Sequence, residues 1–245
     1  VVVQVLPAKA GGLGFQPMLR RGQQAFTLVE MLLVVSIIVL LISMLLPMLS
    51  ASRCQAVTVQ CLGQFEAIGQ GLNMHVIDNS KKLPGPSWYG KEPRYTTGNK
   101  TLARWLAPYM GFKPATSSAQ VNTTFICPAF DAVKPAGYAT ETCVTMGALS
   151  ARNKSNGLRV FGYPAFNGEP EYGPSSIGSV KYPGETQAVK EIDQYNNPTA
   201  GWVEKTSRQP NHCWTGTSEA IRNYVYFDGH AKTIKEFLGT LPDSN

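Results

Sequence analysis

Three residues in the C-terminal part, His212, Asp228 and His230, carry the side chains best suited to chemistry in this chain. Imidazole and carboxylate groups act as metal ligands or as general acids and bases. Asp228 also lies in a predicted hairpin turn, where it would simply accept backbone hydrogen bonds. The sequence contains no G-x-S-x-G nucleophile motif and no P-loop. We therefore treat these residues as weak metal candidates and expect no cofactor and no enzymatic activity.

The chain has five cysteines, Cys54, Cys61, Cys127, Cys143 and Cys213, with no C-x-x-C pair and no zinc-ligand spacing. Cys54 and Cys61 are two helical turns apart, about 10 Å along a helix, which is too far for a disulfide. If the C-terminal part is exported, we expect Cys127 and Cys143 to form the disulfide. Buried thiols are the alternative.

The composition gives little sign of a nucleic-acid surface. Of the 245 residues, 43% are hydrophobic and 16% are charged, and the formal net charge is +6. Lys9, Arg20 and Arg21 contribute three of these positive charges ahead of a long apolar run. The remainder has no Lys/Arg cluster with interleaved aromatic residues, so we expect no nucleic-acid partner.

The longest element begins with residues 26–49, which are apolar apart from two serines, one threonine, Glu30 and Pro47. A helix of this length is about 36 Å long and would cross a hydrocarbon core of about 30 Å. Arg20 and Arg21 precede it, which places the N-terminus in the cytoplasm by the positive-inside rule. A cleaved secretory signal has a shorter apolar region and a small-residue site that is missing here. A plain signal anchor fits the length but leaves Glu30 unexplained.

The segment "QQAFTLVEMLLVVSIIVLLISMLLP" resembles the processing region of type IV pilins and type II secretion pseudopilins. The resemblance implies a leader over residues 1–25, cleavage by a prepilin peptidase between Ala25 and Phe26, and N-methylation of Phe26. It also implies that Glu30 acts in filament assembly and that Pro47 is the family's helix-bending proline. Ala25 stands where the family usually has glycine.

Glu30 has two open explanations, because a carboxylate at the centre of a membrane helix costs about 2.5–3.5 kcal/mol. In a filament of parallel helices, the amino group of Phe26 in one subunit would neutralise Glu30 of a neighbour and fix their stagger. Alternatively, Glu30 lies near the cytoplasmic headgroups and needs no partner.

Residues 50–80 continue the helix with a different surface. A stripe at spacings of three and four predicts an amphipathic helix that ends near Asp78, before "KKLPGP". The stripe consists of Cys54, Thr58, Cys61, Phe65, Ile68 and Leu72. The same segment resembles pseudopilin-like families with a C-L-x-N-L-K-Q-I-G helix followed by L-P, through Cys61, Leu62, Ile68, Gly69, Leu83 and Pro84.

Residues 81–245 are predicted to form a globular domain rich in turns. We expect a short helix over 101–109, a strand over 187–192 and a C-terminal hairpin with a two-residue turn at Asp228-Gly229. A sheet packed on the amphipathic helix gives an α+β, pilin-like fold. Asp228-Gly229-His230 also resembles the end of a pseudopilin-like signature of His, nine residues and Asp-Gly. His212 precedes Asp228 by sixteen positions rather than ten.

Three functions follow as hypotheses. The first is a pseudopilin of a type II secretion or type IV pilus-like filament, a single-pass protein of the bacterial inner membrane with its C-terminal domain periplasmic or extracellular. Its partners would be the prepilin peptidase, other pilin-like subunits, the inner-membrane assembly machinery and the lipid bilayer. The second is a membrane-anchored exported domain that binds a glycan or a secreted substrate. The third is a metal hydrolase at His212, Asp228 and His230.

Overall fold

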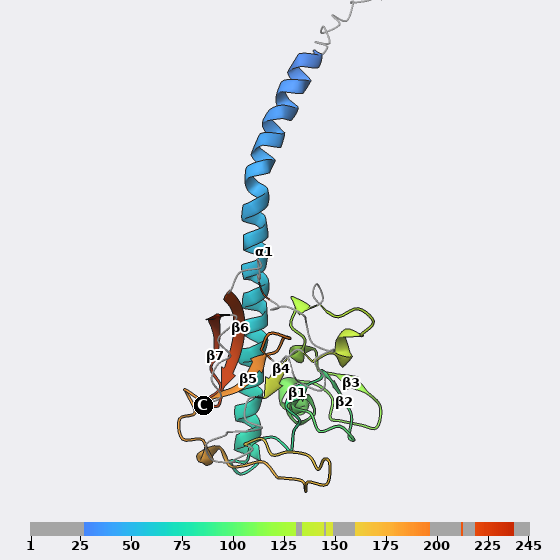
Figure 1. Cartoon of the computed structure of the whole chain (residues 1–245), viewed down its shortest axis with the longest axis vertical. Helices are drawn as coiled ribbons and strands as arrows, with labels where there is room; N and C mark the ends of the chain where they lie inside the picture. The colour runs from blue at the N-terminus through green and yellow to red at the C-terminus, as the bar shows by residue number, and fades with distance from the viewer. Residues whose placement is uncertain are drawn as a thin grey trace, which may run out of the picture. The chain divides into compact units, whose positions relative to one another are not determined.

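The computed structural model describes residues 27–130, 134–144, 146–148, 160–196, 212 and 219–237. The first element, α1, runs from Leu28 to Asp78 and includes Pro47 (Figure 1). The predicted helix end at Asp78 is confirmed, and the chain turns through Ser80 and Lys81, both at positive φ. The chain divides into two compact units, residues 1–47 and 48–245, and each is described by itself.

In the first unit, α1 is apolar on all sides. Its residues from Leu28 to Pro47 are all exposed, and nearly all of them are apolar. Twenty helical residues extend about 30 Å. By length and composition, α1 is the one helix among the described residues that suffices to cross a membrane.

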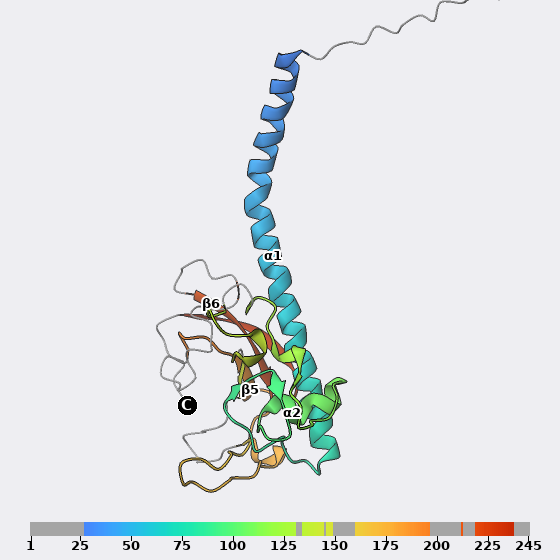
Figure 2. The same ribbon diagram turned by 90° about the vertical axis from the view of Figure 1, so that its right-hand side faces the viewer.

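In the second unit, the remaining part of α1 packs on a five-stranded antiparallel sheet of order β1-β4-β5-β6-β7 (Figures 1 and 2). These strands are β1 (Gly90–Lys91), β4 (Met146–Ala148), β5 (Gln187–Glu191), β6 (Glu219–Tyr226) and β7 (Ala231–Phe237). The observed β5 confirms the strand predicted over 187–192. A long helix with small antiparallel sheets is an α+β, pilin-like arrangement, as predicted.

Short elements cover the rest of the unit. Helix α2 (Leu102–Leu106) continues into the 3-10 helix η1 (Ala107–Met110), in the place of the helix predicted over 101–109. Strands β2 (Arg94–Tyr95) and β3 (Gln120–Val121) form a second, two-stranded sheet. Further 3-10 helices among the described residues are η2 (Thr123–Phe125), η4 (Thr140–Thr142) and η5 (Ile177–Ser179).

The C-terminal hairpin has a longer turn than predicted. The Tyr226 N–H donates to the His230 carbonyl, and the Gly229 N–H donates to the Tyr226 carbonyl. Gly229 has a φ of 93°. This is a three-residue loop whose last residue adopts the left-handed conformation, and it replaces the predicted two-residue turn. Asp228-Gly229 therefore supplies the turn, but with one more residue on the loop.

The predicted stripe of α1 forms the helical side of the core. Cys61, Phe65, Ile68 and Leu72 are buried. Cys54 and Thr58, at the N-terminal end of the stripe, are only partly buried. Burying a large apolar side chain of this kind stabilises the fold by about 1.5–3 kcal/mol. The sheet and the segment around α2 provide the opposing core residues: Val189, Val225, Phe227, Leu102, Leu106 and Phe125.

Candidate functional site

Two parts of the chain concentrate functional side chains, and the first is the start of α1. The cleavage and methylation residues, Ala25 and Phe26, lie outside the described residues. Glu30 lies in the first turn of α1, where its Oε2 accepts hydrogen bonds from the Thr27 N–H at 2.9 Å and the Thr27 hydroxyl at 2.7 Å. The Glu30 N–H donates to Thr27 Oγ1 at 3.3 Å. These reciprocal bonds form a capping box.

The capping box gives Glu30 a local role that our sequence reasoning missed. Thr27-Leu28-Val29-Glu30 has the T-x-x-E pattern of this motif, so the signal was present in the sequence. Only Thr27 donates to Glu30 among the described residues, and it contacts Oε2 alone. Among the described residues, no donor contacts the other carboxylate oxygen, Oε1.

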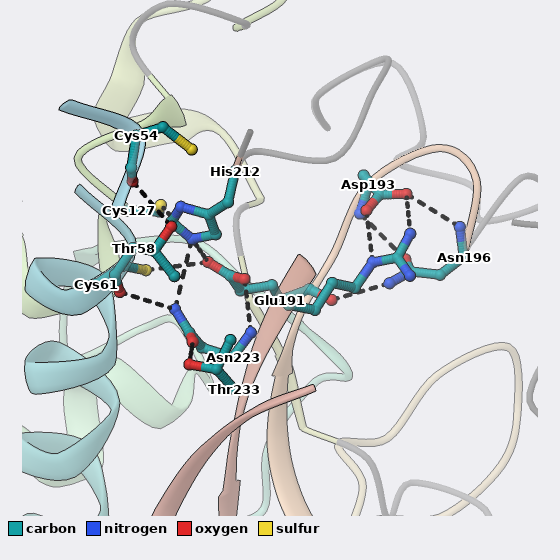
Figure 3. A network of polar contacts seen from close by, with 11 residues as sticks. Cys54, Thr58, Cys61, Cys127, Glu191, Asp193, Asn196, His212, Asn223 and Thr233 are labelled. Carbon is teal, nitrogen blue, oxygen red and sulfur yellow. Dashed lines mark hydrogen bonds and ion pairs between the residues drawn. The ribbon is translucent and has the colours of Figure 1, made fainter. Parts of the chain in front are cut away.

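The second part is a group of four buried side chains, which we call the buried polar cluster: Cys61, Cys127, Glu191 and His212 (Figure 3). Cys61 lies on α1 and Glu191 is the last residue of β5. Cys127 follows η2, and His212 pairs as an isolated bridge with Ile221 of β6. One ligand atom from each residue lies within 4.8 Å of the other three. The fold therefore joins the helix, the sheet and two loops at one point.

Glu191 Oε1 is at the centre of the cluster. It lies 2.6 Å from His212 Nε2 and accepts a hydrogen bond from the Cys61 thiol at 3.0 Å. His212 Nε2 is also 3.5 Å from the Cys127 Sγ. His212 Nδ1 is buried and has no hydrogen-bond partner among the described residues. The Nε2 edge of the imidazole thus faces the cluster.

Asn223 of β6 holds the carboxylate in place. Its backbone N–H donates to Glu191 Oε2 at 2.8 Å, which turns Oε1 toward the cysteines. Its side-chain Nδ2 donates to the Thr58 carbonyl at 3.4 Å, and its Oδ1 accepts from the Thr233 hydroxyl at 2.6 Å (Figure 3). Neighbouring strands and α1 therefore fix the orientation of Glu191.

The electrostatics of the cluster favour the protonated form of His212. Burial alone lowers the pKa of His212, but the charge of Glu191 and the contacts with Cys127 raise it to about 10. Burial, the Cys127 contact and the Glu191 charge raise the pKa of the Cys61 thiol. Burial also acts to raise the pKa of Cys127, yet its contacts with Cys61 and His212 lower it overall. Cys127 is thus the more readily ionised thiol.

The predicted disulfide between Cys127 and Cys143 is wrong. Both residues are buried thiols, and the Cys143 Sγ donates to the Ala139 carbonyl at 3.4 Å. Cys127 instead faces Cys61 and His212, because the loop after η2 directs it toward α1. Cys54 is disulfide-bonded.

The predicted set of His212, Asp228 and His230 is not assembled. His212 pairs with Ile221, whereas Asp228 and His230 lie in the exposed turn at the far end of β6. Five residue steps of extended chain, about 17 Å, run from Ile221 to the end of β6 at Tyr226, where this turn begins. Asp228 Oδ1 accepts from the His230 N–H at 3.1 Å and contacts its Nδ1 at 2.6 Å, as a turn residue does.

The buried polar cluster itself was not predicted as a group. Its members are 66, 64 and 21 residues apart, which matches no short ligand motif. The position of Cys61 on the buried stripe of α1 was the one local signal. The other three come together only through the tertiary fold.

The apolar start of α1 and the sheet on its second half define the class of the chain, an α+β pilin-like arrangement behind an apolar N-terminal helix. Residues 20–46 match the family model described as the prokaryotic N-terminal methylation motif. This is a type IV pilin-like prepilin segment, of the kind that a prepilin peptidase processes. Neither the curated proteins nor the solved structures contain a match to the chain.

Proposed function

We propose that this protein is a pseudopilin-like structural subunit of a type II secretion or type IV pilus-like filament. It would be inserted with its N-terminus in the cytoplasm, cut after Ala25, methylated on Phe26 and assembled through α1. The observation that carries the proposal is the methylation motif over residues 20–46, which overlaps the first part of α1, where the residues from Leu28 to Leu46 are apolar with few exceptions and all exposed.

The exposed apolar helix supports assembly as well as anchoring. A membrane covers such a helix before assembly, and the helices of neighbouring subunits cover it in a filament. Polar groups inside it are few, and Ser36 and Ser43 donate to backbone carbonyls of α1 itself, those of Leu33 and Leu40. Glu30 is the one acidic residue between Thr27 and Pro47, and no described residue donates to its Oε1, which would accept the Phe26 amino group of a neighbour.

The experiment separates the two roles of Glu30. The Glu30→Gln variant keeps an oxygen that accepts from Thr27 but loses the charge, because glutamine also completes a capping box. The Thr27→Val variant loses the hydroxyl while it keeps the charge of Glu30. Each variant is expressed with a prepilin peptidase and the assembly machinery, and filaments are then sheared and quantified.

We expect Glu30→Gln to be inserted, cut and methylated like the parent but to be absent from filaments. Thr27→Val should still assemble. Mass spectrometry of the mature N-terminus, showing N-methyl Phe26, confirms processing in each case. Normal filaments from Glu30→Gln would refute the charge pairing, and an intact leader on the parent protein would refute the subunit role.

A second candidate function, an exported binding domain, has one observation in its favour. Trp88 meets Tyr163 and Phe166 edge-on, with ring centroids 5.1 and 5.5 Å apart, and Phe166 and the nearby Tyr172 are exposed. Aromatic side chains of this kind stack on sugar rings. Loss of glycan binding in Trp88→Ala, with filament assembly unchanged, would support this function.

We also propose that the domain is not an enzyme. The acid–base candidates lie at opposite ends of β6, and the four side chains that do converge are buried. A buried group without access to solvent suits a structural role better than turnover.

A further inference from the structure

We propose that Cys61, Cys127, Glu191 and His212 form a structural zinc site that fastens α1 to the sheet. Nothing in the methylation motif bears on it, so the proposal is independent of the filament function. The four residues are the one group of three or more potential ligands that converge among the described residues.

The donor set is the one that zinc prefers. Structural zinc sites are tetrahedral and closed, with four ligands drawn from thiolate, imidazole and, less often, carboxylate. Here two sulfurs, one imidazole nitrogen and one carboxylate oxygen meet, and all four residues are buried. Zinc bonds of about 2.0–2.3 Å place neighbouring ligand atoms about 3.3–3.8 Å apart. The four atoms already lie within 4.8 Å of one another, so one ion fits between them after small side-chain movements.

Two contacts in the cluster are shorter than the distance between neighbouring zinc ligands, so these atoms would move apart when an ion binds. His212 Nε2 and Glu191 Oε1 are 2.6 Å apart, and Cys61 Sγ and Glu191 Oε1 are 3.0 Å apart. The distance between Cys127 Sγ and His212 Nε2 is 3.5 Å, already that of two zinc ligands. Entry of the ion displaces the protons of the thiols and the imidazolium, as zinc binding requires.

The surroundings of the cluster are those of a metal site. The backbone N–H of Asn223 holds the outer oxygen of Glu191 at 2.8 Å, which orients the inner oxygen. Such outer contacts orient ligands in metalloproteins. With four protein ligands and no exposed member, the site leaves no open position for a substrate.

The redox state of the cysteines gives a second, independent argument. Cys54, two turns before Cys61 on α1, is disulfide-bonded, so the domain is suited to an oxidising compartment. Cys61 and Cys127 nevertheless remain thiols although their sulfurs lie within 4.8 Å. Coordination to zinc, which has no redox chemistry, would keep both from oxidation.

The test uses the full chain in detergent micelles, purified without a histidine tag. Zinc is measured by mass spectrometry of the metal, and the protein is also reconstituted with Co²⁺. We expect about one zinc ion per chain. The cobalt form should show thiolate-to-cobalt charge-transfer bands and the strong visible bands of a tetrahedral site.

The matched variants are Cys61→Ser, Cys127→Ser and Cys143→Ser. Zinc and the cobalt bands should be lost in the first two and kept in the third, since Cys143 is equally buried but bonds to Ala139. The proposal is overturned if the parent binds neither metal, or if peptide mapping finds a Cys61–Cys127 disulfide. It is also overturned if the cobalt spectrum of the parent lacks thiolate bands, a result that needs no variant to fold.

Discussion

The backbone of Gly69 in α1 lies directly against the backbone of Gly229 in the β6–β7 turn. A Cβ atom at Gly69 would lie 2.1 Å from the Gly229 carbonyl oxygen and 2.8 Å from Val225 Cγ2. One helical turn further on, Asn73 Nδ2 donates to the Asp228 carbonyl at 3.0 Å. The helix therefore docks on the hairpin turn through direct backbone contact, which a side chain at position 69 would prevent.

The first prediction concerns this contact. Gly69→Ala should destabilise the domain by at least about 1–3 kcal/mol, because the added methyl group meets rigid backbone rather than a flexible side chain. The measurement is urea denaturation of the full chain in detergent, followed by the fluorescence of its tryptophans.

Gly63→Ala is the matched control, six residues earlier on the same helix. A Cβ atom there has nothing within 4 Å. Alanine should stabilise the helix at this position by up to about 1 kcal/mol, through propensity alone. Equal effects from the two substitutions would show that packing on Gly229 does not determine the role of Gly69.

The same contact shows what could be read from the sequence. The apolar run, the amphipathic stripe and the C-terminal hairpin have local periods, so α1, β6 and β7 were predictable from their own residues. The resemblances at Gly69 and at Asp228-Gly229 were separate observations, 160 positions apart. Only the three-dimensional structure shows that Gly69 lacks a side chain where the turn containing Gly229 packs against α1.

The sheet edge and the buried polar cluster were not predictable. Strands β1 and β4 have two and three residues, too few to show an alternating pattern. Cys127 and Cys143 were paired because they are near in sequence, whereas the chain brings Cys127 to Cys61 instead. Residues that are more than sixty positions apart form no local motif or periodic pattern, so their contact could not be predicted from the sequence.

The second prediction concerns the turn at Asp228. Asp228→Ala should destabilise the domain by less than about 1 kcal/mol, since Asp228 and His230 are both exposed and contact mainly each other. It should leave bound zinc unchanged. Loss of a bound metal in this variant would instead support the metal-hydrolase hypothesis, in which Asp228 is a ligand together with His212 and His230.

The third prediction concerns a buried arginine. Arg222 donates through Nε to Asp193 Oδ2 at 2.8 Å and through Nη2 to Asp193 Oδ1 at 3.1 Å, and its Nη1 contacts Glu236. Arg222→Met should destabilise the domain by about 3–5 kcal/mol, because Asp193 would remain buried without its partner. Chemical denaturation measures the loss.

Arg53→Met on the exposed side of α1 is the control for Arg222, and it should change the free energy of unfolding by no more than about 0.5 kcal/mol. Asp193→Asn combined with Arg222→Met should recover part of the loss, since the uncompensated charge is then gone. A single Arg222→Met variant as stable as the parent would mean that the pair contributes no net stability.

The last prediction is a pH dependence that arises at His75. This residue is buried on α1 with its ring edge-on to Tyr109, 5.4 Å between centroids. Burial lowers its pKa below the ordinary value of 6.5, although the Lys82 backbone and the charge of Asp78 oppose the shift. The unfolded chain therefore binds more protons than the folded one near and below this pH, so His75 contributes stability at neutral pH that is lost on acidification.

The His75→Phe variant tests this dependence, because it keeps an edge-on ring and cannot titrate. The free energy of unfolding of this variant, minus that of the parent, should rise as the pH falls from 7.5 to 5, about the ordinary histidine range. Other titrating groups are common to both proteins and cancel in the difference. A difference that stays constant over this range would mean that His75 titrates alike in the folded and unfolded chain.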